Sequence, residues 1–184
     1  MEKIARICWN TNDWKYPSGP DGKSRSVGTH ENDNGFGHEE WLLDETKVID
    51  GYNYGYIQAI NTDSNKHVGK CYDIHLFTIS PDKQKQYAGC IHNAIGLSRD
   101  ESKQIYEKYK KLGWIEKMKS DIKDGGGKVG ALKPEFLVNV MFKLDEAVIN
   151  YGKMPIIKKN SLGHRYNLMN KEGKIKFEHD RCGK

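Results

Sequence analysis

Cysteine, proline and long apolar runs are scarce in this 184-residue chain. It has four cysteines and five prolines, and no two cysteines form a Cys-x-x-Cys pair. Cysteines in apolar, strand-like surroundings act as small hydrophobic residues, which predicts a reducing compartment and no zinc site. No stretch approaches the ~20 apolar residues of a membrane helix, and the beginning of the chain lacks the apolar run of a signal peptide. We therefore expect a cytoplasmic protein with no membrane partner.

Composition and length favour one folded domain. Hydrophobic residues make up 36% of the chain and aromatic residues 10%, whereas disordered chains are poor in aromatic residues. The formal net charge is +5, a mild basic excess that is compatible with a polyanionic partner. We expect a single domain over residues 1–170, followed by a charged tail at 171–184.

The spacing of apolar residues predicts an α+β protein. Expected strands cover 3–10, 51–60, 70–80, 87–97, 134–144 and 164–170. A capping box at Ser98 and Glu101 begins one long helix that ends in "DGGGKVG" (124–130), and 39–50 suits a short helix. Short strands joined mostly by turns favour a mixed, mostly antiparallel β-barrel with two or more flanking helices over a doubly wound sheet.

A search for catalytic groups yields no complete set. The segment "GHEEW" (37–41) lacks the second histidine of the metalloprotease motif. His30 and His38 with Glu31 are conceivable metal ligands, although solvated loop residues or a helix N-terminus are the more ordinary interpretation. Cys90 and His92 share a strand face, but nothing else supports a thiol mechanism. We expect a binding domain without a cofactor, and a metal-dependent nuclease remains an alternative.

The polar segment "CWNTNDWKYPSGPDGKSRS" (8–26) combines aromatic rings with cations. Trp14 and Tyr16 lie among Asn, Asp, Lys and Pro, and an aromatic ring kept near solvent is typical of a binding site. Stacking is worth ~1–3 kcal/mol per base, and two or three rings can hold a base flipped out of a helix. This segment therefore predicts a nucleobase site.

Polar residues of the same segment supply the other contacts of that predicted site. An asparagine amide offers both a donor and an acceptor, so the base edge is expected to meet Asn10, Asn12 and Asp13. Phosphate groups on either side of the base are expected to meet Lys15, Lys23, Ser24 and Arg25.

The order of segments along the chain resembles a known group of proteins. "ICWNTNDWKYPSG…GKS", "NGFGHEEWLLD", "GYNYGYIQAI" and "KCYDIHLFTISPDKQKQYAGCI" before a capped helix resemble N-terminal reader domains of modification-dependent restriction systems. The part "YDIHLFTIS…YAGCI" is similar to the PUA-like superfold, which includes the EVE, YTH, ASCH and SRA groups. The resemblance covers about residues 4–145. It implies a PUA-like barrel whose mouth holds a modified base in an aromatic cage, with Trp9, Trp14 and Trp41 as candidate walls beside Tyr16.

The resemblance and the aromatic segment together predict a module that binds DNA carrying a methylated or hydroxymethylated base. The resemblance also implies a restriction or defence system in which a nuclease or NTPase is a partner or a fused domain. A methyl group on an exocyclic amine adds apolar surface that a ring can cover, worth ~0.8 kcal/mol per buried carbon. An RNA-binding PUA- or YTH-like module would use the same rings and cations, so RNA remains the alternative partner.

Overall fold

The computed structural model describes residues 1–19, 29–61, 64–157, 162 and 166–171. Its strands are β1 (Glu2–Arg6), β2 (Val48–Ile49), β3 (Tyr52–Gly55), β4 (Cys71–Ile79), β5 (Lys85–Gly96), β6 (Val140–Phe142), β7 (Ala147–Ile149) and β8 (Met169–Asn170). They form one eight-stranded sheet in the order β2-β3-β6-β5-β4-β1-β8, and β7 pairs with β5 off this path. Of the strand pairs described, only β1 with β4 is parallel.

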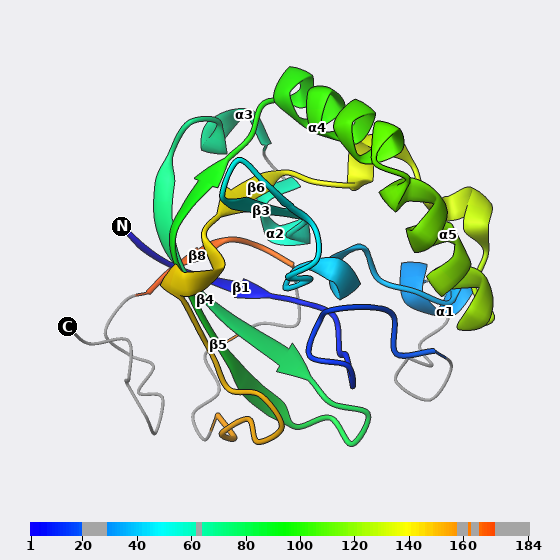
Figure 1. Ribbon diagram of the computed structural model, residues 1–184. Coiled ribbons are helices and arrows are strands. Elements are labelled where there is room, and N and C mark those ends of the chain that lie inside the picture. The colour runs from blue at the N-terminus through cyan, green and yellow to red at the C-terminus, as the bar shows by residue number, and fades with distance from the viewer. Residues whose placement is uncertain (20–28, 62–63, 158–161, 163–165, 172–184) are drawn as a thin grey trace.

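The α+β class and the mostly antiparallel sheet are therefore confirmed. The path of the sheet ends at β2 on one side and at β8 on the other, so the described strands do not close into a barrel. The long hairpin of β4 and β5 occupies the centre (Figure 1) and agrees with the strands expected at 70–80 and 87–97. Both faces of β4 are largely buried, which explains why its sequence is apolar at consecutive positions.

Helices cover the β2-β3-β6 side of this sheet (Figure 1). The α-helices are α1 (His30–Asn34), α2 (Gln58–Asn61), α3 (Ser64–His67), α4 (Arg99–Lys111) and α5 (Trp114–Asp124). The 3-10 turns are η2 (His38–Trp41), η3 (Val129–Ala131), η4 (Pro134–Phe136) and η5 (Leu144–Glu146). None of the described helices is long and apolar enough to cross a membrane.

The expected long helix begins at the residue that the sequence indicates but is interrupted once. The Ser98 hydroxyl accepts from the N–H of Glu101 at 3.2 Å, and the Glu101 carboxylate accepts from the N–H of Ser98 at 2.7 Å. This confirms the capping box. At Gly113 the backbone turns to a φ of 76°, which separates α4 from α5.

Two expected elements are much shorter than the sequence indicates. The helix over 39–50 is reduced to the turn η2 followed by β2, because Glu39, Glu40 and Trp41 are all buried and leave that turn no solvent-facing side. The strand over 134–144 begins as η4, with proline in its first turn, and only β6 joins the sheet.

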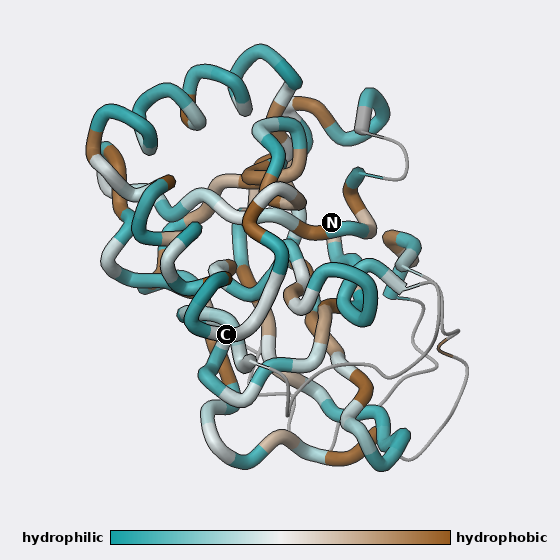
Figure 2. Tube along the Cα trace, turned by 90° about the vertical axis from the view of Figure 1, so that its right-hand side faces the viewer, coloured by the Kyte–Doolittle hydropathy of each residue, from teal (hydrophilic) through white to brown (hydrophobic). Residues whose placement is uncertain are grey.

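Apolar side chains form two main clusters. One fills the space beneath β1, β4, β5 and β6 and includes Trp14. The other lies between the sheet and α4 and α5, and includes Trp41. In Figure 2, hydrophobic stretches of the trace run through the middle of the molecule, and many of the surrounding turns are hydrophilic. Cys8 and Cys90 are buried and Cys71 is exposed, while Cys182 lies outside the described residues.

Candidate functional site

The polar segment at 10–18 is held together by its own side chains. The Asn10 side-chain oxygen accepts from the N–H groups of Asn12 (2.6 Å) and Trp14 (2.9 Å), and its amide donates to the Tyr16 carbonyl at 2.9 Å. The Asn12 amide donates to the Pro17 carbonyl at 2.9 Å. These amide groups stabilise the loop, so the predicted base-edge role of Asn10 and Asn12 is not supported by the geometry.

The predicted tryptophan cage does not form in the described structure. Trp14 is 2% exposed, and its indole N–H donates to the Cys8 carbonyl at 2.9 Å within the core beneath the sheet. Trp41 is 5% exposed and donates to Asp121 at 3.3 Å in the other cluster, under the helices. Trp9 is half-buried and belongs to neither cluster. The three indoles therefore do not face one cavity, because two of them supply core area to separate layers.

Lys15 and Tyr16 of that segment line a broad surface hollow of about 720 Å³. Tyr16 is 52% exposed there, whereas Asp13, which adopts a left-handed backbone with a φ of 55°, does not line this hollow. Lys15 pairs with Glu45 at 3.0 Å. Each lysine of the hollow has an acidic partner, the other two pairs being Lys47–Asp44 and Lys117–Asp121. The predicted phosphate contacts Lys23, Ser24 and Arg25 lie outside the described residues.

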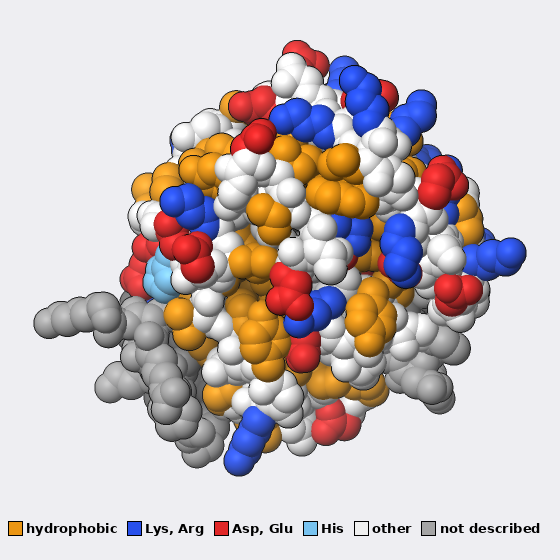
Figure 3. Space-filling view, in the orientation of Figure 1, with side chains coloured by type: hydrophobic (Ala, Val, Ile, Leu, Met, Phe, Trp, Pro, Cys, Tyr) orange, Lys and Arg blue, Asp and Glu red, His pale blue; other side chains and the backbone are white. Residues whose placement is uncertain are grey.

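The lysine-rich surface of α4 and α5 is similarly balanced. Basic and acidic side chains alternate over the part of the surface where α4 lies (Figure 3). The ion pairs of these helices include Lys103–Asp100, Lys108–Asp50 and Lys119–Glu116. Exposed pairs of this kind contribute little to stability and are typical of a solvated helix face.

A second hollow, of about 520 Å³, opens beside η2. We call it the η2 pocket. Its walls come from five parts of the chain: the end of β1, the start of α1, the start of η2, the first residue of α2 and the segment before β8. The lining residues are Arg6, Thr29, His30, Glu31, Gly37, His38, Glu39, Gln58, Tyr166 and Asn167.

The sequence "GHEEW" directs successive side chains to different parts of the molecule. His38 and Glu39 line the η2 pocket. Glu40 is fully buried and accepts from the N–H of Ser18 at 3.2 Å, which anchors the polar segment. Trp41 packs towards α5. The tight 3-10 turn makes this possible, because it spreads neighbouring residues around its axis at three per turn.

Glycine is required where this turn meets the floor of the pocket. A Cβ at Gly37 would stand 2.8 Å from the Cys8 sulfur, closer than atoms in contact allow. The N–H of Gly37 donates to the second carboxylate oxygen of Glu40 at 3.2 Å. The close approach of Cys8, just after β1, to η2 therefore depends on the absence of a side chain at position 37.

Glu39 forms the buried end of the η2 pocket. It is 4% exposed, and one of its carboxylate oxygens accepts from the backbone N–H of Gln58 at 3.1 Å. Burial raises the pKa of Glu39 to about 7, against the opposing effect of the hydrogen bond from Gln58. Near neutral pH the carboxyl group is therefore divided between an acceptor-only form and a form that also donates a proton.

Flat groups line the pocket around this carboxyl group. The His30 and His38 rings lie with centroids 4.3 Å apart. Burial lowers the pKa of both histidines, that of His38 to about 3, so His38 is neutral at physiological pH. The Arg6 guanidinium lies over the Tyr166 ring, 4.4 Å from its centroid. The Tyr166 hydroxyl donates to Glu31 at 3.2 Å, and burial raises the pKa of that hydroxyl.

The two histidines that the sequence suggested as metal ligands do meet, but without a ligand set around them. Within the described residues no group of three His, Cys, Asp or Glu side chains is placed to hold a metal ion. The geometry thus offers no specific support for the nuclease alternative. What the η2 pocket presents instead is a set of planar surfaces around one buried carboxyl group.

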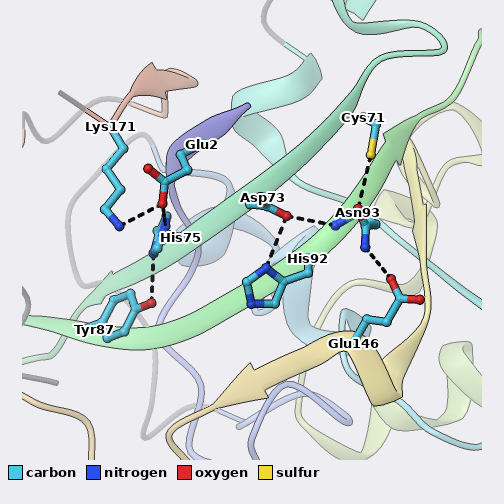
Figure 4. A network of polar contacts seen from close by, with 9 residues as sticks. All are labelled: Glu2, Cys71, Asp73, His75, Tyr87, His92, Asn93, Glu146 and Lys171. Carbon is cyan, nitrogen blue, oxygen red and sulfur yellow. Dashed lines mark hydrogen bonds and ion pairs between the residues drawn. The ribbon is translucent and has the colours of Figure 1, made fainter. Parts of the chain in front are cut away.

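A further polar network follows the β4-β5 hairpin (Figure 4). His75 is buried between the Tyr87 hydroxyl (2.9 Å) and Glu2 (3.3 Å), which ties β1 to the hairpin. Nearby, Asp73 accepts from the N–H of Asn93 at 3.1 Å and lies 3.2 Å from the His92 ring. Asn93 has a φ of 53°, at an irregularity of the β4-β5 register. These contacts stabilise that irregularity. Cys90, on the same strand as His92, is fully buried and is therefore not accessible as a nucleophile.

Comparison with known proteins adds no assignment to this geometry. No protein-family model matches the chain, and no curated protein or solved structure is significantly similar to it. Of the pocket residues, the sequence pointed to His30 and His38, though as metal ligands. It gave no sign of Arg6, Gln58 or Tyr166 as partners, because no spacing pattern links positions so far apart.

Proposed function

We propose that this chain is a DNA-binding module that holds a modified base, flipped out of the duplex, in the η2 pocket. The observation that supports this is the presence of planar groups and a buried carboxyl group in one hollow. Arg6 with Tyr166, and His30 with His38, offer faces for a base. Glu39 offers a hydrogen-bonding group to its edge.

The proposal keeps the binding function that the sequence predicted but assigns it to a different site. Residues that lie at the η2 pocket replace the tryptophan cage, because Trp14 and Trp41 are core residues. The order of segments that resembles PUA-like readers favours a methylated or hydroxymethylated base. It also favours a PUA-like barrel as the finer description of the fold, and a nuclease or NTPase as a partner or fused domain of a restriction system.

Binding to one duplex, with and without a modified base, tests the proposal. We expect the wild-type chain to prefer the modified duplex. Tyr166→Ala should weaken that binding by ~1–3 kcal/mol, through the loss of one stacking surface. Glu39→Gln, which keeps the size of the side chain, should reduce the preference for the modified duplex, because the amide presents different donors and acceptors.

Tyr16→Ala is the matched control, since it removes an exposed ring at the other hollow. It should bind both duplexes like the wild type, and circular dichroism should show that every variant is folded. Equal affinity of the wild type for the two duplexes would contradict the proposal. Tighter binding of single-stranded RNA than of either duplex would instead identify an RNA-binding module.

A further inference from the structure

The η2 pocket has a buried end and a polar outer rim. Gly37 and Glu39 are buried, whereas His30 and Asn167 at the opposite extreme are exposed. Hydrogen-bonding side chains dominate the less buried part of the lining, namely Thr29, His30, Glu31, Gln58 and Asn167. A base that reaches Glu39 would therefore carry its outer substituents among polar groups.

The pocket is also larger than a base. At about 30 Å³ for each non-hydrogen atom, the value for liquid water, a volume of about 520 Å³ holds roughly 17 atoms. A pyrimidine base brings about eight by the same count. A flipped base stays attached to its deoxyribose, so this volume admits the base, its sugar and a small substituent. The polar groups at the rim, rather than the volume, bear on the nature of that substituent.

Two side-chain amides at this rim are available to such a substituent. Asn167 makes no side-chain hydrogen bond within the part of the chain that the structure describes, and it is exposed. The Gln58 side-chain oxygen accepts from the Tyr56 hydroxyl at 2.8 Å, and the Gln58 amide N–H₂ has no partner among the described residues. Amides both donate and accept, which matches hydroxyl groups and offers nothing to a methyl group.

We infer that the modified base carries a hydroxyl-bearing substituent, a hydroxymethyl group or a sugar attached to it, which binds at the polar rim of the η2 pocket. This inference rests on the proposed function, since it names the ligand of the same site. The partly buried Gln58 amide would be left unpaired by a ligand that lacks a hydroxyl group, and a group of this kind discriminates against such a ligand. The exposed Asn167 adds one hydrogen bond to a hydroxyl group.

The test compares four duplexes of one sequence that carry cytosine, 5-methylcytosine, 5-hydroxymethylcytosine or glucosylated 5-hydroxymethylcytosine at one position. Dissociation constants are measured by fluorescence anisotropy with the complete chain. We expect at least one hydroxyl-bearing duplex to bind about tenfold or more tightly than the 5-methylcytosine duplex. Asn167→Ala should reduce that ratio about three- to tenfold, the effect of one hydrogen bond.

Asn65→Ala is the control, because Asn65 is an exposed amide that does not line the pocket. It should leave all four affinities as in the wild type. If 5-methylcytosine binds as tightly as the hydroxyl-bearing bases, or if Asn167→Ala leaves the ratio unchanged, the inference is overturned while the proposed function stands. If all four duplexes bind equally, both the inference and the proposed function fail.

Discussion

Single residues show how burial overrides the character of a local segment. Trp14 has polar neighbours in the chain, yet it is among the largest fully buried side chains of the described structure. The backbone reaches this arrangement through left-handed conformations at Asp13 and Trp14, with φ values of 55° and 56°. Sequence context predicts exposure here, because nothing in the residue types reveals that the chain folds back onto the Cys8 carbonyl.

The position of Trp14 leads to a prediction about stability. Trp14→Ala should lower the free energy of unfolding by ~3–5 kcal/mol, through the loss of a large buried side chain. Tyr16→Ala, two residues away and exposed, should change it by no more than about 0.5 kcal/mol. Urea denaturation of the three proteins measures both values. A Trp14 variant as stable as the wild type but defective in DNA binding would restore the tryptophan-cage hypothesis.

Two ionisable residues of η2, Glu39 and His38, should affect stability with opposite dependence on pH. Burial raises the pKa of Glu39 from 4.5 to about 7, so the folded state holds this proton more tightly than the unfolded chain. The contribution of Glu39 to the free energy of unfolding is therefore greatest below pH 4.5. It declines as the pH rises to 7, by roughly 3 kcal/mol in total. Burial lowers the pKa of His38 from 6.5 to about 3. The contribution of His38 to the free energy of unfolding therefore increases as the pH rises from 3 to 6.5.

Variants separate the two contributions. Relative to the wild type, Glu39→Gln should become progressively more stable as the pH rises from 4.5 to 7. Relative to the wild type, His38→Asn should become progressively less stable as the pH rises from 3 to 6.5. Urea unfolding curves at several pH values provide the data. A constant difference between either variant and the wild type would show that the residue titrates at its ordinary pKa in the folded protein.

At the scale of elements, the helical region depends on one backbone reversal. Gly113 separates α4 from α5 with a φ of 76°, and no atom lies near enough to hinder an added Cβ. The cost of alanine there would come from the backbone conformation alone. Gly113→Ala should therefore destabilise the fold by about 1 kcal/mol. Gly130→Ala, which is also free of nearby atoms but has no positive φ, should be neutral or slightly stabilising.

Thermal unfolding followed at 222 nm compares the two alanine variants directly. Equal melting temperatures would mean that the break between the helices does not require the left-handed conformation. A lower melting temperature for the Gly130 variant would contradict the assignment of strain to Gly113.

Elements defined by local contacts could be predicted from the sequence, and elements defined by distant contacts could not. The hairpin of β4 and β5 and the start of α4 follow from alternation and from a capping box, which operate within a few residues. The turn η2 follows no such pattern, because Glu39 and Glu40 are buried through partners at positions 58 and 18. Carboxylates in a short acidic run ordinarily indicate a solvated helix end.

At the scale of the whole molecule, the candidate site combines residues that are up to 161 positions apart, from Arg6 to Asn167. Periodicity identifies the elements but does not show which of their ends meet. The sequence drew attention to His30 and His38, which do line the η2 pocket, but it gave no indication that Trp14 and Trp41 belong to separate core clusters. The parallel pairing of β1 with β4 sets the position of Arg6. The residue types alone do not predict that Arg6 lies near η2.

The proposed function gives a prediction for the salt dependence of the whole complex. Phosphate contacts govern the salt dependence of DNA binding, whereas the modified substituent is proposed to meet uncharged side-chain amides at the rim of the η2 pocket. The affinities for modified and unmodified duplexes should thus fall with the same slope between about 50 and 200 mM salt. Their ratio should stay constant in a fluorescence anisotropy titration. A ratio that collapses with salt would place the selectivity in ion pairing.

The position of β1 has a consequence for how the chain acquires its structure during synthesis. The strand is synthesised well before both of its partners, because its parallel partner β4 begins at Cys71 and its antiparallel partner β8 at Met169. Ile4 and Ala5, both buried in the finished protein, stay uncovered until those partners have been translated. The nascent polypeptide therefore exposes a short apolar strand during synthesis, and shielding by a chaperone should raise the yield of native protein.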